Sequence, residues 1–262
     1  MMEQNERFLL EPPIPENAFT IQGGNWTSRV PGLTNTMTGN LDLFSDDRMK
    51  WVLDNLKIQT GIKVLELGPL EGAHSSQLEA AGLSVVAIEA NVNAFLRCLI
   101  VKNHFDMKTK FLLGDFGAVD YIFPKVDLIV ASGVLYHQQN PLALLEKISR
   151  SSDQLFLWTH IWDDRYELWD SEIVKLVGKK FIPKSTQTLI FNGLKIRLIP
   201  YLYENTLDWD GFTGGVAGGS KWIHREDLVP LLKSFGYDDV KLNFDQADHP
   251  HGPAIGIWAS RS

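Results

Sequence analysis

Three acidic residues stand at or near the ends of three consecutive apolar runs that predict strands. Glu66 lies in the run at residues 63–67, Glu89 ends the second run, and Asp115 follows the third. Ligands of open parallel sheets bind at the carboxyl ends of the strands, so we expect these acids at one edge. One carboxylate there can accept both hydroxyls of a ribose, and another can accept from the amine of an adenine. The pattern predicts an adenosine site; ordinary solvated acids are the alternative.

The turn after the first run contains two glycines, Gly68 and Gly72. Glycine tolerates a positive φ and lets a ligand approach closely, and a helix beginning near Gly72 would direct its unpaired N–H groups into the turn. NAD and S-adenosylmethionine both contain adenosine. The dinucleotide pattern requires Gly-x-Gly-x-x-Gly, whereas this chain has Glu66-x-Gly68-x-x-x-Gly72, with Glu71 positioned to repel a pyrophosphate. We therefore expect S-adenosylmethionine.

Four histidines fall on the same predicted edge. His137 follows the fourth strand, His160 ends the fifth, and His249 and His251 lie in the turn at residues 245–253. Histidine is suited to remove a proton near pH 7, as methylation of an oxygen requires. A hydrogen-bonded structural role is the alternative for each of them, and we expect at least one to be functional.

A metal-assisted site is a further alternative. His160 with Asp163 and Asp164 could supply ligands to a divalent ion. A solvated acidic loop explains the same residues, and we predict no metal.

Alternating strands and helices predict the fold that positions these residues. Apolar strands without polar alternation indicate a parallel sheet covered on both faces. Residues 46–160 and 223–262 are expected to form a Rossmann-like, doubly wound α/β core with seven strands, mostly parallel, of which the last is antiparallel. Ser45 is expected to cap the first helix of this core, and Pro141 to open a later one.

Two segments lie outside the predicted core. Residues 1–45 are rich in proline, glycine and apolar residues and read as an arm that packs on the core, with the sharper alternative that part of it closes over the site. Residues 161–222 are too long for an ordinary connection, and Asn192-Gly193 predicts a hairpin with a type I′ turn over residues 188–199. We expect both segments to form a lid over the acceptor site.

The strand and glycine turn at residues 64–72 resemble the first motif of the class I S-adenosylmethionine-dependent methyltransferases. Val64-Leu-Glu-Leu-Gly-Pro-Leu-Glu-Gly72 is similar to their first motif, Val86-Ala-Ile-Glu-Ala90 to their second, and Gly114-Asp115 to their adenine-side acid, although Leu70 replaces a common glycine. The resemblance covers roughly residues 46–160 and 223–262. It implies a donor site with the methionine end at the first motif, the ribose at the second and the adenine at the third. The expected contacts are Glu66, Gly68, Gly72, Glu89, Ala90, Asp115, Phe116, Ser132 and Tyr136.

The segment from Ser132 to Pro141 resembles the Gly-Val-Leu-Tyr-His segment of the tRNA wobble-uridine carboxymethyltransferases and of related small-molecule methyltransferases. In those tRNA enzymes two arginines commonly follow the histidine, where this chain has Gln138 and Gln139. A net charge of −7 also argues against a phosphate-backbone partner. We expect a small-molecule acceptor, methylated on oxygen by in-line displacement with a histidine as base. An RNA-modifying methyltransferase is the first alternative, and a non-catalytic S-adenosylmethionine-binding protein the second.

Length and composition indicate the number of domains and the cellular compartment. A chain of 262 residues with 44% hydrophobic residues fits one large α/β domain with insertions. Cys98 is the only cysteine, so no intrachain disulfide can form, as expected in a reducing cytosol. No apolar run approaches the roughly 18 residues of a membrane span, and the acidic first residues do not resemble a signal peptide. The sequence predicts a cytoplasmic protein without a membrane partner.

Overall fold

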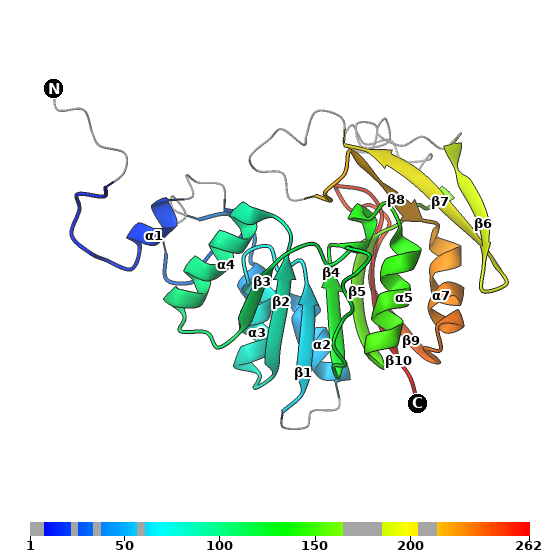
Figure 1. Ribbon diagram of the computed structural model, residues 1–262, viewed down its shortest axis with the longest axis horizontal. Helices are drawn as coiled ribbons and strands as arrows, with labels where there is room; N and C mark the ends of the chain where they lie inside the picture. The colour runs from blue at the N-terminus through cyan, green and yellow to red at the C-terminus, as the bar shows by residue number, and fades with distance from the viewer. Residues whose placement is uncertain (1–7, 22–25, 34–37, 57–60, 165–184, 204–213) are drawn as a thin grey trace.

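The computed structural model describes residues 8–21, 26–33, 38–56, 61–164, 185–203 and 214–262. A seven-stranded sheet runs through the body of the chain, and a separate three-stranded sheet stands beside it (Figure 1). In spatial order the large sheet consists of β3 (Lys110–Leu113), β2 (Ser84–Glu89), β1 (Lys63–Leu67), β4 (Leu128–Ser132), β5 (Gln154–His160), β10 (Ala254–Ser260) and β9 (Asp239–Gln246).

Strand pairing confirms the predicted class. β1 pairs in parallel with β2 and β4, and the same direction continues to β3 and β5. β10 runs antiparallel to both of its neighbours, β5 and β9, so the last strand is the reversed one. The sheet is therefore Rossmann-like and mostly parallel, and its carboxyl edge also receives the turn between β9 and β10.

Helices cover both faces of the large sheet, which explains why its strands are continuously apolar. On one face lie α2 (Asp47–Asn55) and α3 (Ala73–Ala80), which share a buried cluster with Val64 and Val130. On the other lie α5 (Pro141–Ser151) and α7 (Arg225–Ser234), packed over Leu65 and Ile129. α4 (Val92–His104) completes the cover near β2 and β3.

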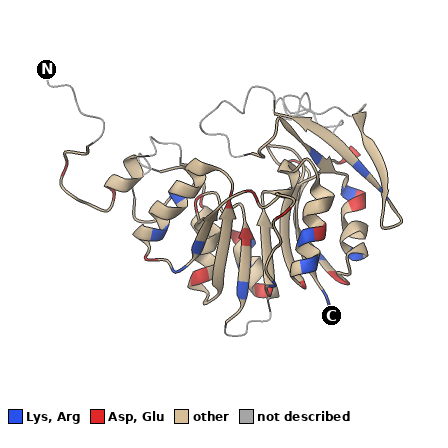
Figure 2. Cartoon of the chain, in the orientation of Figure 1, with Lys and Arg blue, Asp and Glu red and all other residues tan. Residues whose placement is uncertain are grey.

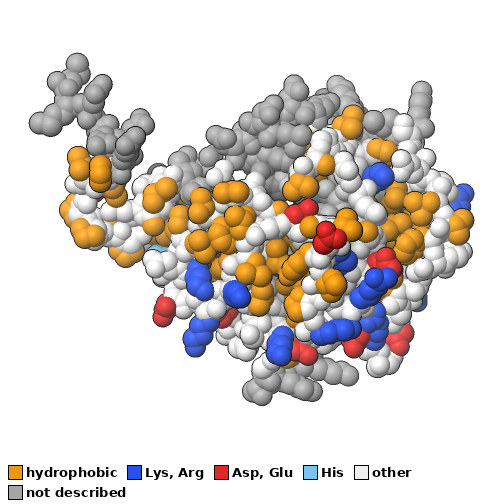
Figure 3. Space-filling view, viewed as in Figure 1, with side chains coloured by type: hydrophobic (Ala, Val, Ile, Leu, Met, Phe, Trp, Pro, Cys, Tyr) orange, Lys and Arg blue, Asp and Glu red, His pale blue; other side chains and the backbone are white. Residues whose placement is uncertain are grey.

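The arm packs on the core, as its apolar residues predict. Phe19, which lies in α1 (Asn17–Thr20), is buried together with Trp26 and Val30 against Cys98 and Val101 of α4. Figure 3 shows hydrophobic side chains exposed on this face of the molecule. Val92, Leu96 and Leu99 of α4 are exposed.

The predicted hairpin is present. β6 (Gln187–Phe191) and β7 (Leu194–Leu202) are antiparallel, and both Asn192 and Gly193 have positive φ, as a type I′ turn requires. The sequence did not predict β8 (Gly219–Ile223), which pairs with β7 and makes the small sheet three-stranded. Glycine is disfavoured in strands, so the glycine-rich sequence before β8 did not predict a strand there.

One predicted cap was wrong by one residue. Ser45 lies in a short 3₁₀ helix, η1 (Leu43–Ser45), and the N-cap of α2 is Asp46, whose carboxylate accepts the backbone N–H of Arg48 at 2.8 Å. Among the helices of the described residues, none combines the length and hydropathy needed to span a bilayer.

Candidate functional site at the carboxyl edge of the large sheet

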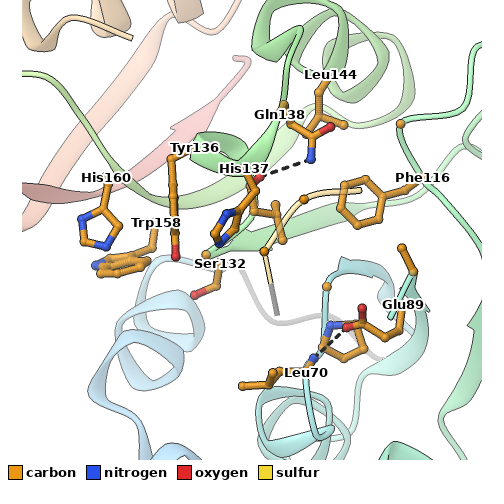
Figure 4. A pocket seen from close by; sticks show the side chains of 18 of the residues that line it. Leu70, Glu89, Phe116, Ser132, Tyr136, His137, Gln138, Leu144, Trp158 and His160 are labelled. Atoms are coloured by element: carbon orange, nitrogen blue, oxygen red, sulfur yellow. Dashed lines mark hydrogen bonds between the residues drawn. The ribbon is translucent and has the colours of Figure 1, made fainter. Parts of the chain in front are cut away.

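A cavity of about 780 Å³ opens at the carboxyl edge of the large sheet, within the size range of small-molecule sites. Its walls come from the ends of the parallel strands, the turn between β9 and β10, the arm, and residues 214–217 of the insertion. Figure 4 shows its two ends: Glu89, Leu70 and Phe116 lie on one side, and Trp158 and His160 on the other. Tyr136 and His137 stand between them, on η2 (Leu135–His137).

Three residues of the turn after β1 have positive φ, namely Gly68, Leu70 and Gly72. Gly68 has φ 65°, and a Cβ at this position would lie 2.4 Å from Cγ1 of Val134, so only glycine fits. Leu70, which replaces a glycine common in the motif that this segment resembles, also has a positive φ of 58°. Its backbone N–H donates to Oε2 of Glu89 at 3.1 Å, which ties the turn to the end of β2.

Glu89 lies in the wall of the cavity, where the sequence predicted it. Its side chain is mostly buried and also accepts the backbone N–H of Asn91 at 2.8 Å. Burial raises the pKa of Glu89, and the hydrogen bonds from the backbone amides oppose that shift. Ala90 lies beside it in the same wall.

Asp115 and Phe116 also line the cavity. The ring of Phe116 is buried and faces the cavity (Figure 4). The carboxylate of Asp115 is exposed, and Oδ1 accepts the backbone N–H of Gly117 at 2.7 Å. Lys147, on α5, donates to the carbonyl oxygen of Phe116 at 3.3 Å and so holds this loop.

Two expected donor contacts lie beneath the wall. Glu66 is 1% exposed, accepts a hydrogen bond from the Ser75 hydroxyl, and has its Oε1 4.0 Å from Nδ1 of His74. Burial raises its pKa. Gly72 is the N-cap of α3, with φ 77° and the ring of Phe111 against it. Neither Glu66 nor Gly72 lines the cavity, whereas Gly68, Ser132 and Tyr136 do.

Glu71 does not face the ligand side, so its predicted repulsion of a pyrophosphate was wrong. Its carboxylate is completely buried and accepts the backbone N–H groups of Thr27 and Ser28, each at 2.7 Å. Nε of Arg97 lies 3.2 Å from the same carboxylate. Glu71 therefore anchors the arm, a contact between residues more than 40 positions apart that the local sequence does not reveal.

Sequence reasoning missed Arg48 and Trp158. The Arg48 guanidinium lies 4.7 Å from the centre of the Trp158 ring, and both residues line the cavity. Arg48 is paired with Asp46, which also contacts Nε2 of His74 at 2.8 Å. Burial acts to raise the pKa of Asp46, but the hydrogen bonds from His74 and Arg48 outweigh it and lower that pKa overall. Arg48 lies in the first turn of α2 and belongs to no sequence motif, so the sequence did not indicate that it lines the cavity.

All four predicted histidines line this cavity. The Tyr136 ring lies between two of them, with ring centres 4.1 Å from His137 and 4.5 Å from His160. The His160 ring is stacked on Trp222 at 5.0 Å, and the His249 ring lies 4.9 Å away.

The histidine rings are held through their Nδ1 atoms. Nδ1 of His160 lies 2.9 Å from the carbonyl oxygen of Gly252 and 3.2 Å from that of Pro253. Nδ1 of His137 is 2.5 Å from the Tyr203 hydroxyl. Nδ1 of His249 accepts the backbone N–H of His251 at 3.2 Å.

Burial keeps three of these rings neutral near pH 7. It lowers the pKa of His137 to about 4 and that of His249 to about 4. It lowers the pKa of His160 to about 3, with a further contribution from His249. Each ring therefore carries one N–H and one lone pair, and can donate or accept a proton at defined atoms.

Within the described ranges, no group of three or more His, Cys, Asp or Glu side chains is arranged to hold a metal ion. Of the residues considered for a metal, His160 is bonded to carbonyl groups, and Oδ2 of Asp164 lies 3.1 Å from Nε2 of His224.

Figure 2 shows Lys and Arg interspersed with Asp and Glu on the helices rather than gathered in one stripe.

A family model described as a methyltransferase domain matches residues 43–242. No curated protein matches the chain. Among solved structures, the N-terminal domain of EvdMO1 with SAH bound matches with a TM-score of 0.70 and 19% identity, over 94% of this chain and 95% of that one. The same domain in the presence of SAH and D-fucose gives 0.69 and 18%, over 99% and 100%. Magnesium protoporphyrin IX methyltransferase (ChlM) from Synechocystis PCC 6803, with bound SAH, gives 0.53 and 14%, over 83% and 81%. At such identities the likeness to these structures concerns the fold alone.

Proposed function

The chain belongs to the methyltransferase-domain family, and we propose that it transfers a methyl group from S-adenosylmethionine to a hydroxyl oxygen of a small molecule. The observation that carries this proposal is the meeting, in one cavity, of a buried ribose-type carboxylate at Glu89 with a cluster of neutral histidines. The first supports the donor and the second supports an oxygen acceptor.

The residues of one end of the cavity fit S-adenosylmethionine. Two bonds to backbone amides orient the Glu89 carboxylate, and its remaining lone pairs can accept the ribose hydroxyls. The ring of Phe116 can pack against the adenine, and the tight turn at Gly68 lines the same cavity. Similar folds bind SAH, the demethylated product of this donor, in EvdMO1 and ChlM. When bound, S-adenosylmethionine supplies a methyl group already activated by its sulfonium.

The other end of the cavity suits a small, uncharged acceptor. Tyr136, Trp158 and His160 give it aromatic walls, and two cations, Arg48 and Lys147, are found among the described residues of the lining. Arg48 is paired with Asp46, and Lys147 is bonded to backbone carbonyls. The similarity to a domain crystallised in the presence of SAH and D-fucose, and to an enzyme named for a porphyrin, supports an acceptor of small-molecule size.

The arm and the insertion fit the role of a lid over this acceptor. Thr27, Leu41 and Leu43 contribute to the cavity from the arm, and residues 214–217 contribute from the insertion. We accordingly divide the chain into a core, residues 46–160 plus 223–262, and two lid segments, residues 1–45 and 161–222. Enclosure of this kind excludes water from the transfer and holds the acceptor in line with the methyl group.

The experiment is incubation of the protein with methyl-labelled S-adenosylmethionine and either a fractionated small-molecule extract or purified RNA. We expect label in a small molecule, with the methyl group on oxygen in the mass spectrum of the product. Label in RNA would identify an RNA-modifying enzyme instead. Calorimetric binding of S-adenosylmethionine without turnover on any pool would identify a non-catalytic binding protein.

A further inference from the structure

The histidines of the cavity meet different kinds of hydrogen-bond partner at Nδ1. We propose that His160 is the base, that His137 and His249 present N–H groups to the acceptor, and that Tyr203 is the positioning residue that keeps His137 in this role. The proposal rests on the proposed function and assigns residues to it. A neutral imidazole carries a single N–H, so the partner of Nδ1 decides what Nε2 can do.

His160 is fixed with its proton on Nδ1. The two groups at that atom are the carbonyl oxygens of Gly252 and Pro253, which accept hydrogen bonds and cannot donate them. Nε2 therefore keeps a free lone pair, and no described residue is bonded to it. Stacking on Trp222 and the edge contact with Tyr136 hold the ring in this orientation.

His249 is fixed in the opposite form. The group at its Nδ1 is the backbone N–H of His251, which can only donate. Nδ1 of His249 must therefore be the unprotonated nitrogen, and Nε2 bears the hydrogen. The ring lies next to His160 but cannot remove a proton through Nε2 while it is neutral.

His137 is directed by a residue of the insertion. Tyr203 follows β7, and its hydroxyl oxygen lies 2.5 Å from Nδ1 of His137. Burial raises the pKa of Tyr203 to about 12, so the phenol keeps its proton, and its oxygen also has hydrogen bonds with the Ser220 side chain and the backbone amide of Gly215. The Gly215 amide can only donate, so it occupies a lone pair of the phenol oxygen, and we assign the phenol O–H to Nδ1 of His137. His137 then carries its hydrogen on Nε2, and within the described part of the chain that atom has no other partner.

These assignments give the transfer a direction and indicate the acceptor class. The acceptor hydroxyl donates to Nε2 of His160, its oxygen bonds to the methyl carbon, and the carbon–sulfur electron pair stays on sulfur. The hydroxyl proton passes to His160 and then to water, leaving a methyl ether and SAH. A lone pair at His160 and N–H donors at His137 and His249, all lining one cavity, match a neutral ring that bears a hydroxyl and further oxygens, as polyols do.

The test is ¹⁵N NMR of the histidine side chains in the full chain saturated with SAH. We expect His160 to be protonated on Nδ1, and His137 and His249 on Nε2. A protonated Nδ1 in His137 would overturn the assignment of His137 as a hydrogen-bond donor to the acceptor molecule. An unprotonated Nδ1 in His160 would overturn its assignment as the general base. The measurement does not depend on turnover, so its failure is distinguishable from failure of the proposed function.

Tyr203→Phe tests the positioning role, because it removes the hydroxyl and keeps the ring. We expect the His137 signals to shift toward a mixture of forms while those of His160 stay unchanged. Tyr201→Phe is the matched control, since Tyr201 lies two residues earlier and stacks on Trp222. If the two variants change the His137 spectrum equally, Tyr203 is not the positioning residue.

With the acceptor found in the labelling experiment, glutamine substitutions separate a base from a donor. The glutamine amide can donate near the position of Nε2 but cannot act as a base. His160→Gln should lose roughly 10²- to 10⁴-fold in turnover, the usual size of a general base. His137→Gln should lose only about tenfold, comparable with weakening one hydrogen bond. Equal losses would contradict the division between the two residues.

Discussion

At the scale of single residues, Glu89 both lines the cavity and holds its backbone in place. Its carboxylate closes the turn at Leu70 and the start of α4 at Asn91 through backbone N–H groups. These bonds stabilise the charged form, which burial disfavours. The side chain is therefore held in one orientation before any ligand arrives, which reduces the cost of ordering it on binding.

Glu89→Ala should weaken S-adenosylmethionine binding roughly 10- to 100-fold, the usual size of lost hydrogen bonds to a charged group. Calorimetry measures the affinity directly. Glu79→Ala is the matched control, because Glu79 also accepts two backbone N–H groups, those of Lys108 and Thr109 at 2.7 Å each, but does not line the cavity. It should lower stability and leave affinity unchanged. Unchanged affinity in Glu89→Ala would end the ribose assignment.

At the scale of elements, the arm is fastened to the turn after β1 through one buried carboxylate, that of Glu71. Glu71 accepts the backbone N–H groups of Thr27 and Ser28 and lies against Arg97 of α4. Thr27 lines the cavity, so the same contact connects the arm to the site. A buried charge left without its partner is costly, which makes this pair sensitive to substitution.

Glu71→Ala should lower the free energy of unfolding by about 3–5 kcal/mol, because it leaves the Arg97 guanidinium buried without its carboxylate. Urea denaturation gives this value, and hydrogen exchange should show faster exchange of the Thr27 and Ser28 amides. The control is Glu146→Ala, which breaks the exposed pair with Arg150 and should cost less than about 0.5 kcal/mol. Slow exchange at Thr27 in the Glu71 variant would show that the arm does not depend on this anchor.

The elements that could be predicted are those specified by local patterns. Continuous apolar runs identify the parallel strands, Asn192-Gly193 identifies the hairpin, and the strand-end rule brings His137 and His160 to one edge. Contacts between residues far apart in the chain could not be predicted from the sequence. Glu71 reads locally as a loop acid beside the ligand, and only the folded arm shows its partners. Tyr203 contacts a histidine 66 positions earlier, a pairing that no spacing in the chain predicts.

At the scale of the whole molecule, the buried histidines link stability to pH. The pKa of His137 is about 4 and that of His160 about 3 in the folded chain, against 6.5 for an unperturbed histidine. Below pH 6.5 the unfolded chain therefore binds more protons than the folded one. Stability from these neutral rings is complete above pH 6.5 and is lost as the pH falls toward the folded pKa values. Buried Glu66 and Glu89 act in the opposite direction, because their pKa values are raised.

The double variant His137→Gln, His160→Gln isolates this contribution. Each histidine should reduce the free energy of unfolding by roughly 2 kcal/mol between pH 7.5 and pH 5. Urea denaturation at both pH values gives the decrease in the free energy of unfolding from pH 7.5 to pH 5. This decrease should be smaller in the double variant than in the unsubstituted chain, by as much as about 4 kcal/mol. Comparing the two losses removes the contribution of Glu66 and Glu89, which both proteins share. Equal losses would mean that the two rings take up protons in the folded chain, and neither could then serve as a neutral base or donor below pH 6.5.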